Sequence, residues 1–195
     1  NISKMKNSQK RKVMNIKKKK KNTKDKKQRR NKKSLEDYVS ILKKESGRVS
    51  PAHSVMLPRM IRSKGRVFIS DRPTFVSTNF FVIEADEMGA KILASWFSTI
   101  FYQLECEAYG NNRKGLRKLE KEDYEPLHVP VTSELSEEEK QRIVSTQINE
   151  FINLRSPQVR DVDRVWAEIL FGKNAEELIE EALTLIPILV ADREK

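Results

Sequence analysis

The chain of 195 residues contains 39 Lys and Arg, 28 Asp and Glu, two His and one Cys, and its formal net charge is +11. Residues 1–33 carry 17 Lys or Arg and one acidic residue, whereas the other 162 residues carry 22 basic and 27 acidic ones. The positive net charge therefore describes the N-terminal segment, and it excludes any argument from charge alone that the folded part binds nucleic acid.

Three further features exclude other classes of site. The single cysteine, Cys106, rules out an intramolecular disulfide, which fits a reducing compartment. One cysteine and two distant histidines, His53 and His128, are too few ligands for a metal cluster. Neither an apolar run near 18 residues nor the apolar middle of a signal peptide is present. We therefore expect a soluble, cytoplasmic protein with no metal and no membrane span.

Residues 1–33 form a lysine-rich segment with only isolated apolar side chains. Burial of so little apolar surface cannot offset the roughly 1–2 kcal/mol per residue that ordering a backbone costs, so we expect a disordered basic tail. Its composition leaves three roles open: a solvated segment without a partner, a salt-dependent contact to phosphates, or a nuclear or nucleolar address.

Beyond the tail, a helical pattern gives way to strands. Residues 34–47 predict a short helix that ends at a glycine. Residues 55–70 predict two extended pieces around a turn at residues 63–65, and Pro58 favours a sheet edge for the first piece. The dense apolar run NFFVI at residues 79–83 predicts a buried strand.

Residues 91–110 predict one amphipathic helix. Asp86 can cap its N-terminus, and Gly110 is expected to end it in the left-handed conformation. Spacings of three and four place seven residues on one face: Leu93, Trp96, Phe97, Ile100, Phe101, Leu104 and Ala108. Because the aromatic residues share this face with aliphatic ones, we expect them in the core and not as platforms for bases.

A basic loop over residues 111–118 and a short strand are predicted next. The strand is indicated by Leu127, Val129 and Val131, which alternate with other residues, and the proline at 130 places it at a sheet edge.

The last part of the chain predicts three helices. Ser136 and Glu139 form a capping-box pair that opens a helix through about Leu154, with Val144, Ile148, Phe151 and Ile152 facing inward. A second helix covers residues 162–170, and a third begins at residue 174 and is stopped by Pro187. Strands followed by helices indicate an α+β fold: a small mixed or antiparallel sheet packed with helices over residues 34–135, followed by a helical part of the same domain over residues 136–195.

The sequence contains no recognisable catalytic residues. Its six glycines never form a spacing typical of phosphate or cofactor binding, and no nucleophile elbow is present. Glu138-Glu139-Lys140 contains the Glu-x-Lys fragment found in nucleases, but acidic residues also belong in the first turn of a capped helix. We interpret this fragment as ordinary chemistry of a helix start.

The candidate binding residues lie in the more basic half of the body. Residues 48–118 contain 11 basic and 6 acidic residues, whereas residues 119–195 contain 9 and 18. The amides of Asn111 and Asn112 match adenine edges, and Arg113 matches guanine. Tyr109 stands beside the loop and could contact a base or a sugar. Seven cations suit phosphates: Arg59, Arg62, Lys64, Arg66, Lys114, Arg117 and Lys118. The alternative is that the asparagines are turn residues and the cations a solvated face.

Four stretches in succession carry a family resemblance: STNFFVIE (77–84), KILASWFSTIFYQLECEAYG (91–110), RKGLRKLEKEDYEPLHVPV (113–131) and SEEEKQRIVSTQINEF (136–151). This succession resembles the C-terminal target recognition domain of gamma-class adenine-N6 DNA methyltransferases, and it is similar to specificity subunits of type I restriction enzymes. PRMIRSKGRVFIS (58–70) looks like the segment that introduces this domain in adenine methyltransferases and in fused restriction-modification enzymes.

The resemblance implies a recognition core that binds double-stranded DNA and works with a methyltransferase catalytic domain or subunit. Family members bind S-adenosylmethionine through a Phe-x-Gly-x-Gly motif and position adenine with an (Asn/Asp/Ser)-Pro-Pro-(Tyr/Phe) motif, and this sequence has neither. We therefore expect no cofactor in this chain, with S-adenosylmethionine in the catalytic domain.

Two other classes of function remain open. The acidic helices from residue 136 onward could dock another protein in a non-catalytic assembly subunit, for which an exposed row of Leu, Ile and Trp would be diagnostic. The lysine-rich tail could instead serve an RNA-binding or ribosome-associated protein.

Overall fold

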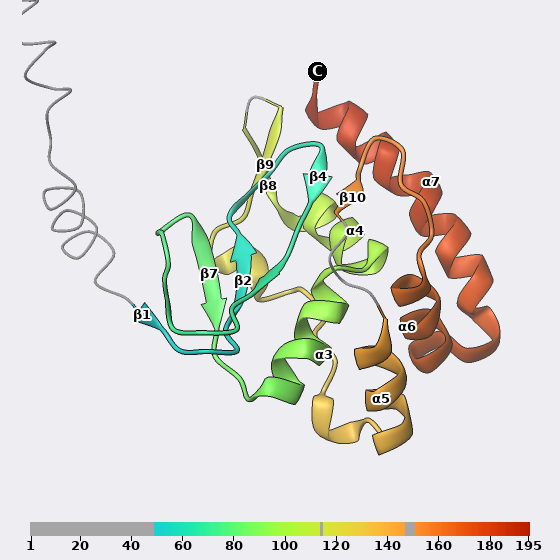
Figure 1. The fold of residues 1–195 in the computed structure, drawn as a ribbon. Helices are drawn as coiled ribbons and strands as arrows, with labels where there is room; N and C mark the ends of the chain where they lie inside the picture. Colours follow the sequence, from blue (N-terminus) through green and yellow to red (C-terminus); the bar gives the residue numbers. More distant parts are fainter. Residues whose placement is uncertain (1–48, 114, 147–150) are drawn as a thin grey trace, which may run out of the picture. The chain divides into compact units, whose positions relative to one another are not determined.

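The computed structural model describes residues 49–113, 115–146 and 151–195, shown in colour in Figure 1. The predicted basic tail and the predicted helix at residues 34–47 lie outside these ranges. The described residues form short antiparallel strands and five α-helices, so the predicted α+β class is confirmed.

The strands form four small antiparallel sheets, with orders β1-β6, β10-β4, β5-β2-β7 and β3-β9-β8. Their bounds are β1 (Val49–Ser50), β2 (Val55–Pro58), β3 (Met60–Ile61), β4 (Lys64–Gly65), β5 (Phe68–Ile69), β6 (Thr74–Phe75), β7 (Phe80–Ile83), β8 (Asn111–Arg113), β9 (Leu116–Lys118) and β10 (Ile152–Asn153).

Strand β2 is the central strand of its sheet, so the edge position predicted from Pro58 is wrong. Val55 pairs with Ile69 of β5 on one side and with Ile83 of β7 on the other. Pro58 is tolerated because it is the last residue of β2, and the next N–H, that of Arg59, donates to the carbonyl of Asn79 at 2.9 Å. The edge strands are β5 and β7, and all residues of β7 are half-buried, not fully buried as predicted.

The predicted hairpin over residues 55–70 forms only at its ends, where β2 pairs with β5. The middle of the segment leaves this sheet: β3 pairs with β9, and β4 pairs with β10. Residues 64–65, predicted as a turn, are therefore a strand. Gly65 is required by close packing, because a Cβ there would lie 2.3 Å from Oε1 of Gln103.

The predicted helix over residues 91–110 is two helices, α3 (Glu87–Phe97) and α4 (Ile100–Tyr109). The side chain of Asp86 caps α3 as predicted and accepts the N–H of Gly89 at 2.6 Å. The helix breaks at residues 98–99 because Thr99 caps α4, and the buried Asp163 accepts the N–H of Ile100 at 2.8 Å. A partner 63 residues away thus satisfies a donor that a continuous helix would have used.

Gly110 ends α4 in an extended conformation, with φ −71° and ψ 154°, and not in the predicted left-handed one. It is constrained by space, because a Cβ at this position would lie 2.5 Å from Cδ of Arg117 and 2.8 Å from the carbonyl oxygen of Cys106.

Residues 127–131 do not form the predicted strand. The N–H of His128 donates to Glu105 at 3.0 Å, and its carbonyl accepts the indole N–H of Trp96 at 2.8 Å. Side chains of α3 and α4 therefore take the backbone groups that a sheet would have paired. Short 3-10 turns precede and follow this segment: η1 (Glu122–Tyr124) and η2 (Thr132–Glu134).

Helix α5 (Glu137–Ser145) begins with the predicted capping box of Ser136 and Glu139. It ends nine residues before the predicted Leu154, because the chain enters β10 to pair with β4. Phe151, predicted to face inward, is 46% exposed. The predicted core residue Ile148 lies outside the described residues.

Helices α6 (Asp161–Phe171) and α7 (Ala175–Arg193) are joined by η3 (Gly172–Asn174). The predicted stop at Pro187 is wrong, since α7 continues for six residues beyond it. Proline removes one helical hydrogen bond, but Ile186 and Val190 on either side of it are buried against the core. This packing holds the helix together.

Helix α3 lies between the β5-β2-β7 sheet and helices α5 and α6 (Figure 1). At the centre of the core, the rings of Trp96 and Trp166 meet edge to face at 5.4 Å, and Nε1 of Trp166 donates to Ser95 at 2.9 Å. Trp96, Phe97 and Phe101 are buried, which confirms the prediction that the aromatic face of residues 91–110 is core.

Candidate nucleic-acid interface

The three-stranded sheet β3-β9-β8 joins two basic segments that are distant in sequence. Lys118 of β9 pairs with Asn111 of β8 on one side and with Met60 of β3 on the other. Residues 60–61 therefore lie beside residues 117–118. The predicted loop over residues 111–118 is in fact a β-hairpin, which turns through Gly115 at φ +76°, a conformation that favours glycine.

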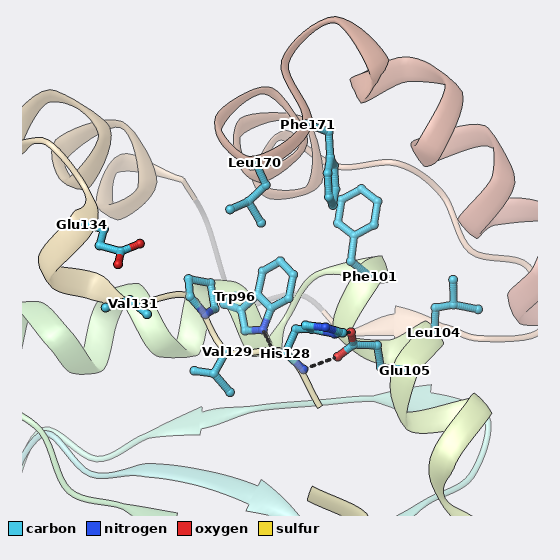
Figure 2. A pocket seen from close by; sticks show the side chains of 11 residues that line it. Trp96, Phe101, Leu104, Glu105, His128, Val129, Val131, Glu134, Leu170 and Phe171 are labelled. Carbon is cyan, nitrogen blue, oxygen red and sulfur yellow. Dashed lines mark hydrogen bonds and ion pairs between the residues drawn. The ribbon is translucent and has the colours of Figure 1, made fainter. Parts of the chain in front are cut away.

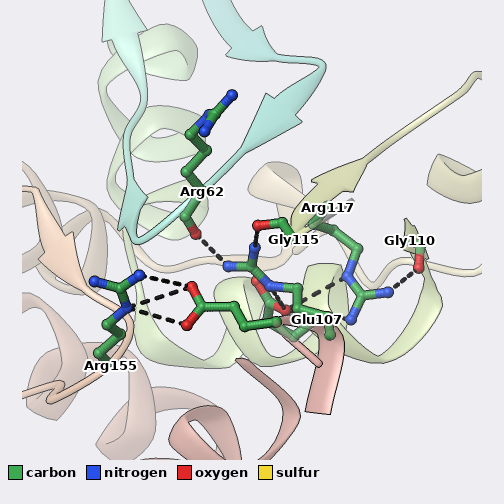
Figure 3. A network of polar contacts seen from close by, with 8 residues as sticks. Arg62, Glu107, Gly110, Gly115, Arg117 and Arg155 are labelled. Carbon is green, nitrogen blue, oxygen red and sulfur yellow. Dashed lines mark hydrogen bonds and ion pairs between the residues drawn. The ribbon is translucent and has the colours of Figure 1, made fainter. Parts of the chain in front are cut away.

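A buried ionic network anchors this hairpin to the C-terminal helix (Figure 3). The carboxylate of Glu107 in α4 accepts Nε of Arg193 at 2.9 Å and Nη2 of Arg117 at 3.3 Å. Arg193 also donates to the carbonyl of Gly115 at 2.9 Å and to that of Arg62, and Arg117 donates to the carbonyl of Gly110. One carboxylate and two guanidinium groups thus position both basic segments.

Two of the predicted phosphate contacts, Arg59 and Lys118, form ion pairs with the same carboxylate, Glu120. The hydrogen bond from Lys118, followed by that from Arg59, holds the pKa of Glu120 below its usual value, although partial burial opposes this shift. Arg59 also lies over the ring of Phe81, 5.1 Å from its centroid. These two cations are held in place, and part of their charge is compensated.

Among the predicted base contacts, Asn111 donates its amide to both carboxylate oxygens of Asp123, at 2.9 and 3.1 Å. Asn112, Arg113 and Tyr109 are exposed, and no hydrogen bond or ion pair of their side chains to another described residue is present. Because side chains alternate along a strand, Asn112 points to the face of β8 opposite that of Asn111 and Arg113. Asn111, Asn112 and Arg113 therefore cannot act as one continuous reading surface.

A second group of cations follows the other segment. Arg62, Lys64 and Arg66 are exposed, and they alternate with Ile61, Gly65 and Val67, which are buried or half-buried. Residues 62–63 bend between β3 and β4, so the two-residue period places only Lys64 and Arg66 on one face of an extended segment. Of the eleven predicted contacts, only Lys114 lies outside the described residues.

A separate apolar hollow of about 540 Å³ lies on the other side of α4 (Figure 2). It is lined by aromatic and aliphatic groups from α3, α4, α6 and residues 128–134, including Trp96, Phe101, Val131 and Leu170. The only His in its lining, His128, lies with Nδ1 2.5 Å from Glu105. No hydroxyl or thiol of a described residue lines the hollow next to this pair.

Sequence reasoning missed the residues that organise the interface, namely Glu107, Glu120, Asp123 and Arg193. Each contacts its partners across a turn or from another element, and no local pattern in the sequence signals such contacts. Charged and uncharged residues alternate along residues 61–67, and this pattern could have predicted their alternating exposure. The predicted turn at residues 63–65 prevented that interpretation.

Among residues 49–113, 115–146 and 151–195, no group of three His, Cys, Asp or Glu side chains could hold a metal ion. No helix described in the same ranges is long and apolar enough to cross a membrane.

Comparison with known proteins decides the family. Residues 1–159 match the family model described as "Restriction endonuclease BpuSI, specificity domain". The chain belongs to this family. The solved structure of BpuSI, a type IIG restriction endonuclease, matches 83% of this chain with a TM-score of 0.71 and 34% identity. No curated protein matches the sequence.

The match covers 19% of the BpuSI chain, so this protein corresponds to about a fifth of that enzyme. The expected resemblance to recognition domains of restriction-modification enzymes is confirmed. The chain carries a specificity domain of the BpuSI type, and its fold matches that of the domain in BpuSI.

Proposed function

We propose that this domain binds double-stranded DNA and recognises the target sequence of a restriction-modification enzyme, the catalytic groups of which lie outside the chain. The observation that carries this proposal is the pairing of β3 with β9, which brings the exposed Arg62 beside the hairpin with Asn112 and Arg113. Membership of the BpuSI specificity-domain family supports it.

The described contacts divide the predicted residues by role. Arg117 is 8% exposed and shares Glu107 with Arg193, so it builds the hairpin and does not reach DNA. Arg62, Lys64 and Arg66 form an exposed row suited to phosphates, which position a protein on the duplex. At the edge of the sheet, Arg113 carries a group that can read a guanine edge in the major groove, and Asn112, on the opposite face of β8, can make only a separate contact to a base.

The proposal also includes the reaction that the partner catalytic domain would carry out. The resemblance to gamma-class adenine-N6 methyltransferases implies a partner domain that binds S-adenosylmethionine and methylates adenine at N6. That partner would extrude the target base from the helix, because the reacting atom is inaccessible in a stacked duplex. The role of this chain would be to hold the duplex in register.

The proposal is tested by selecting from a randomised duplex DNA pool with the full chain at about 150 mM salt, at which purely electrostatic binding through the lysine-rich segment is weakened. We expect one enriched motif. Arg113→Ala should remove the preference at one position of that motif. Lys173→Ala, which removes one exposed cation from η3, should leave the motif unchanged.

Failure of the wild-type chain to enrich any motif would contradict target recognition. Equal enrichment by the wild type and by an Asn112→Ala, Arg113→Ala double variant would place the reading surface elsewhere in the domain.

One observation favours the alternative of an assembly role. Leu185 and Ile188 lie one turn apart on α7 and are 37% and 58% exposed. An exposed apolar pair on a helix is typical of a surface that contacts another protein. The DNA selection, run on the wild type and on an Ile188→Lys variant, separates the two functions. A DNA-recognition domain enriches the same motif in both forms, whereas an assembly subunit enriches no motif in either.

A further inference from the structure

Phe151 is an exposed aromatic side chain in a basic environment. It is 46% exposed and directly precedes β10, the strand that pairs with β4. Nζ of Lys64 lies 4.0 Å from the centroid of its ring, and Cζ of Arg66 lies 5.1 Å from it. Cation–π contacts hold both cations beside the ring, while 46% of Phe151 remains open to solvent and can contact a ligand.

A polar hollow adjoins this ring. It has a volume of about 300 Å³ and is lined by Phe151, Ile152, Asn153, Ser156, Gln158 and Arg160. Its wall thus combines an aromatic face with amide and hydroxyl groups, which can both donate and accept hydrogen bonds. The Oδ1 atom of Asn153 accepts the N–H of Arg155 at 3.3 Å, which leaves the amide Nδ2 group as a donor.

The hollow is anchored to the framework of the candidate interface. The N–H of Leu154 donates to the carbonyl of Ser63 at 2.9 Å, and Asn153 pairs with Lys64 in the β10-β4 register. Lys64 is itself one of three cations that alternate along residues 62–66, the first of which lies beside the β8-β9 hairpin. Phe151, Asn153, Lys64 and Arg66 therefore lie together along the β10-β4 pair.

We propose that this hollow binds a single unstacked nucleobase of DNA, with Phe151 as the stacking platform and Lys64 and Arg66 on the flanking phosphates. The inference rests on the proposed DNA-binding function and adds to it a residue and a ligand: an extrahelical base. Aromatic stacking is independent of base identity because every base has a π-face, whereas the amides of Asn153 and Gln158 select among base edges.

A paired base in B-form DNA offers only its edges, so its faces are not available to a phenyl ring. An aromatic platform beside a polar hollow therefore fits a base that has left the stack better than it fits a duplex contact. Stacking on aromatic side chains is worth about 1–3 kcal/mol per base, which corresponds to about a 5- to 150-fold change in affinity on truncation to alanine.

The test compares the affinity of the full chain for two duplexes of identical sequence, one fully paired and one with a single extrahelical adenine, labelled in a second experiment as 2-aminopurine. The wild type should bind the bulged duplex more tightly, and its 2-aminopurine fluorescence should be quenched on binding. Phe151→Ala should abolish the preference with a loss of about 5- to 150-fold on the bulged duplex, and Phe151→Trp should retain it.

Phe68→Ala is the matched control. Phe68 is likewise exposed, at 40%, but it meets Phe80 edge to face and does not line the hollow. It should leave the bulge preference unchanged. If Phe151→Ala weakened paired and bulged duplexes equally, the ring would be a general apolar contact and the inference would be wrong.

The two proposals fail differently. A wild-type chain that enriches a duplex motif but binds both duplexes equally keeps the proposed function and overturns the extrahelical-base site. A chain that binds neither duplex at about 150 mM salt overturns both. Asn153→Ala, with the ring intact, should keep the bulge preference but reduce the discrimination among the four extrahelical bases.

Discussion

The buried carboxylate of Glu107 predicts a large loss of stability when its charge is removed. Its side chain is 0% exposed, and those of Arg193 and Arg117 are 1% and 9% exposed. Glu107→Gln keeps the shape of the side chain but leaves two buried guanidinium groups without an anion. Breaking a buried ion pair by removing one partner costs about 3–5 kcal/mol, because the charge left behind is uncompensated.

Because glutamine keeps one carbonyl oxygen as an acceptor, we expect a loss near the lower end of this range, about 3 kcal/mol. For a chain of this size, that corresponds to a fall in Tm of about 6–12 °C. Urea unfolding of the full chain, followed by circular dichroism, measures the free energy of unfolding. The urea concentration at the transition midpoint should fall, whereas the slope of the free energy of unfolding against urea concentration should not change.

Glu194→Gln provides the control, because Glu194 directly follows Arg193 in the chain. Glu194 pairs with Arg155 at 2.9 Å, but the side chains of these residues are 30% and 63% exposed (Figure 3). Exposed pairs contribute little, so this variant should lose only a small fraction of what Glu107→Gln loses. Equal stability of the two variants would refute the reasoning. A Glu107→Gln, Arg193→Met double variant should lose less stability than the sum of the losses of the two single variants, because both changes remove the same interaction.

Four further outcomes are expected. Gly110→Ala should destabilise the protein in urea unfolding by displacing the side chain of Arg117, whereas Gly89→Ala, where the nearest atom belongs to an exposed carboxylate, should have a small effect; similar losses would contradict the close approach at Gly110. Glu120→Gln should increase affinity for random duplex DNA and steepen its salt dependence, because it releases two cations. Since the pKa of Glu120 is lower in the folded chain than its usual 4.5, its contribution to stability is present above pH 4.5 and is lost as the pH falls below that value; the stabilities of wild type and Glu120→Gln should therefore converge in acid. Burial raises the pKa of the Cys106 thiol, so a thiol reagent at pH 8 should modify the native chain only as fast as it opens, and a rapid reaction without denaturant would show the thiol to be accessible.

Local chemistry in the sequence determined the start of several elements. Asp86 caps α3, and the Ser136 and Glu139 pair opens α5, because each cap uses side chains and N–H groups only three residues apart. The apolar period of residues 161–171 likewise determined α6 and its end at Gly172. The α+β class followed from the order of these patterns along the chain.

The tertiary structure decided where partners distant in sequence compete for backbone groups. Asp163 accepts the N–H of Ile100 and ends one helix before the next begins. Trp96 and Glu105 bond the backbone of His128, and a predicted strand does not form. Each of these outcomes depends on a contact between residues more than 20 positions apart, which no local propensity encodes.

The candidate interface shows the same division. The sequence by itself determined which residue types could hold phosphates and read bases, since charge and hydrogen-bonding groups are properties of the side chains. Only the tertiary structure decided their roles: it buried Arg117 against Glu107, paired Lys118 with Glu120, and left Arg113 exposed. The physical reason is that a cation is available to DNA only where folding has not already supplied it with a carboxylate.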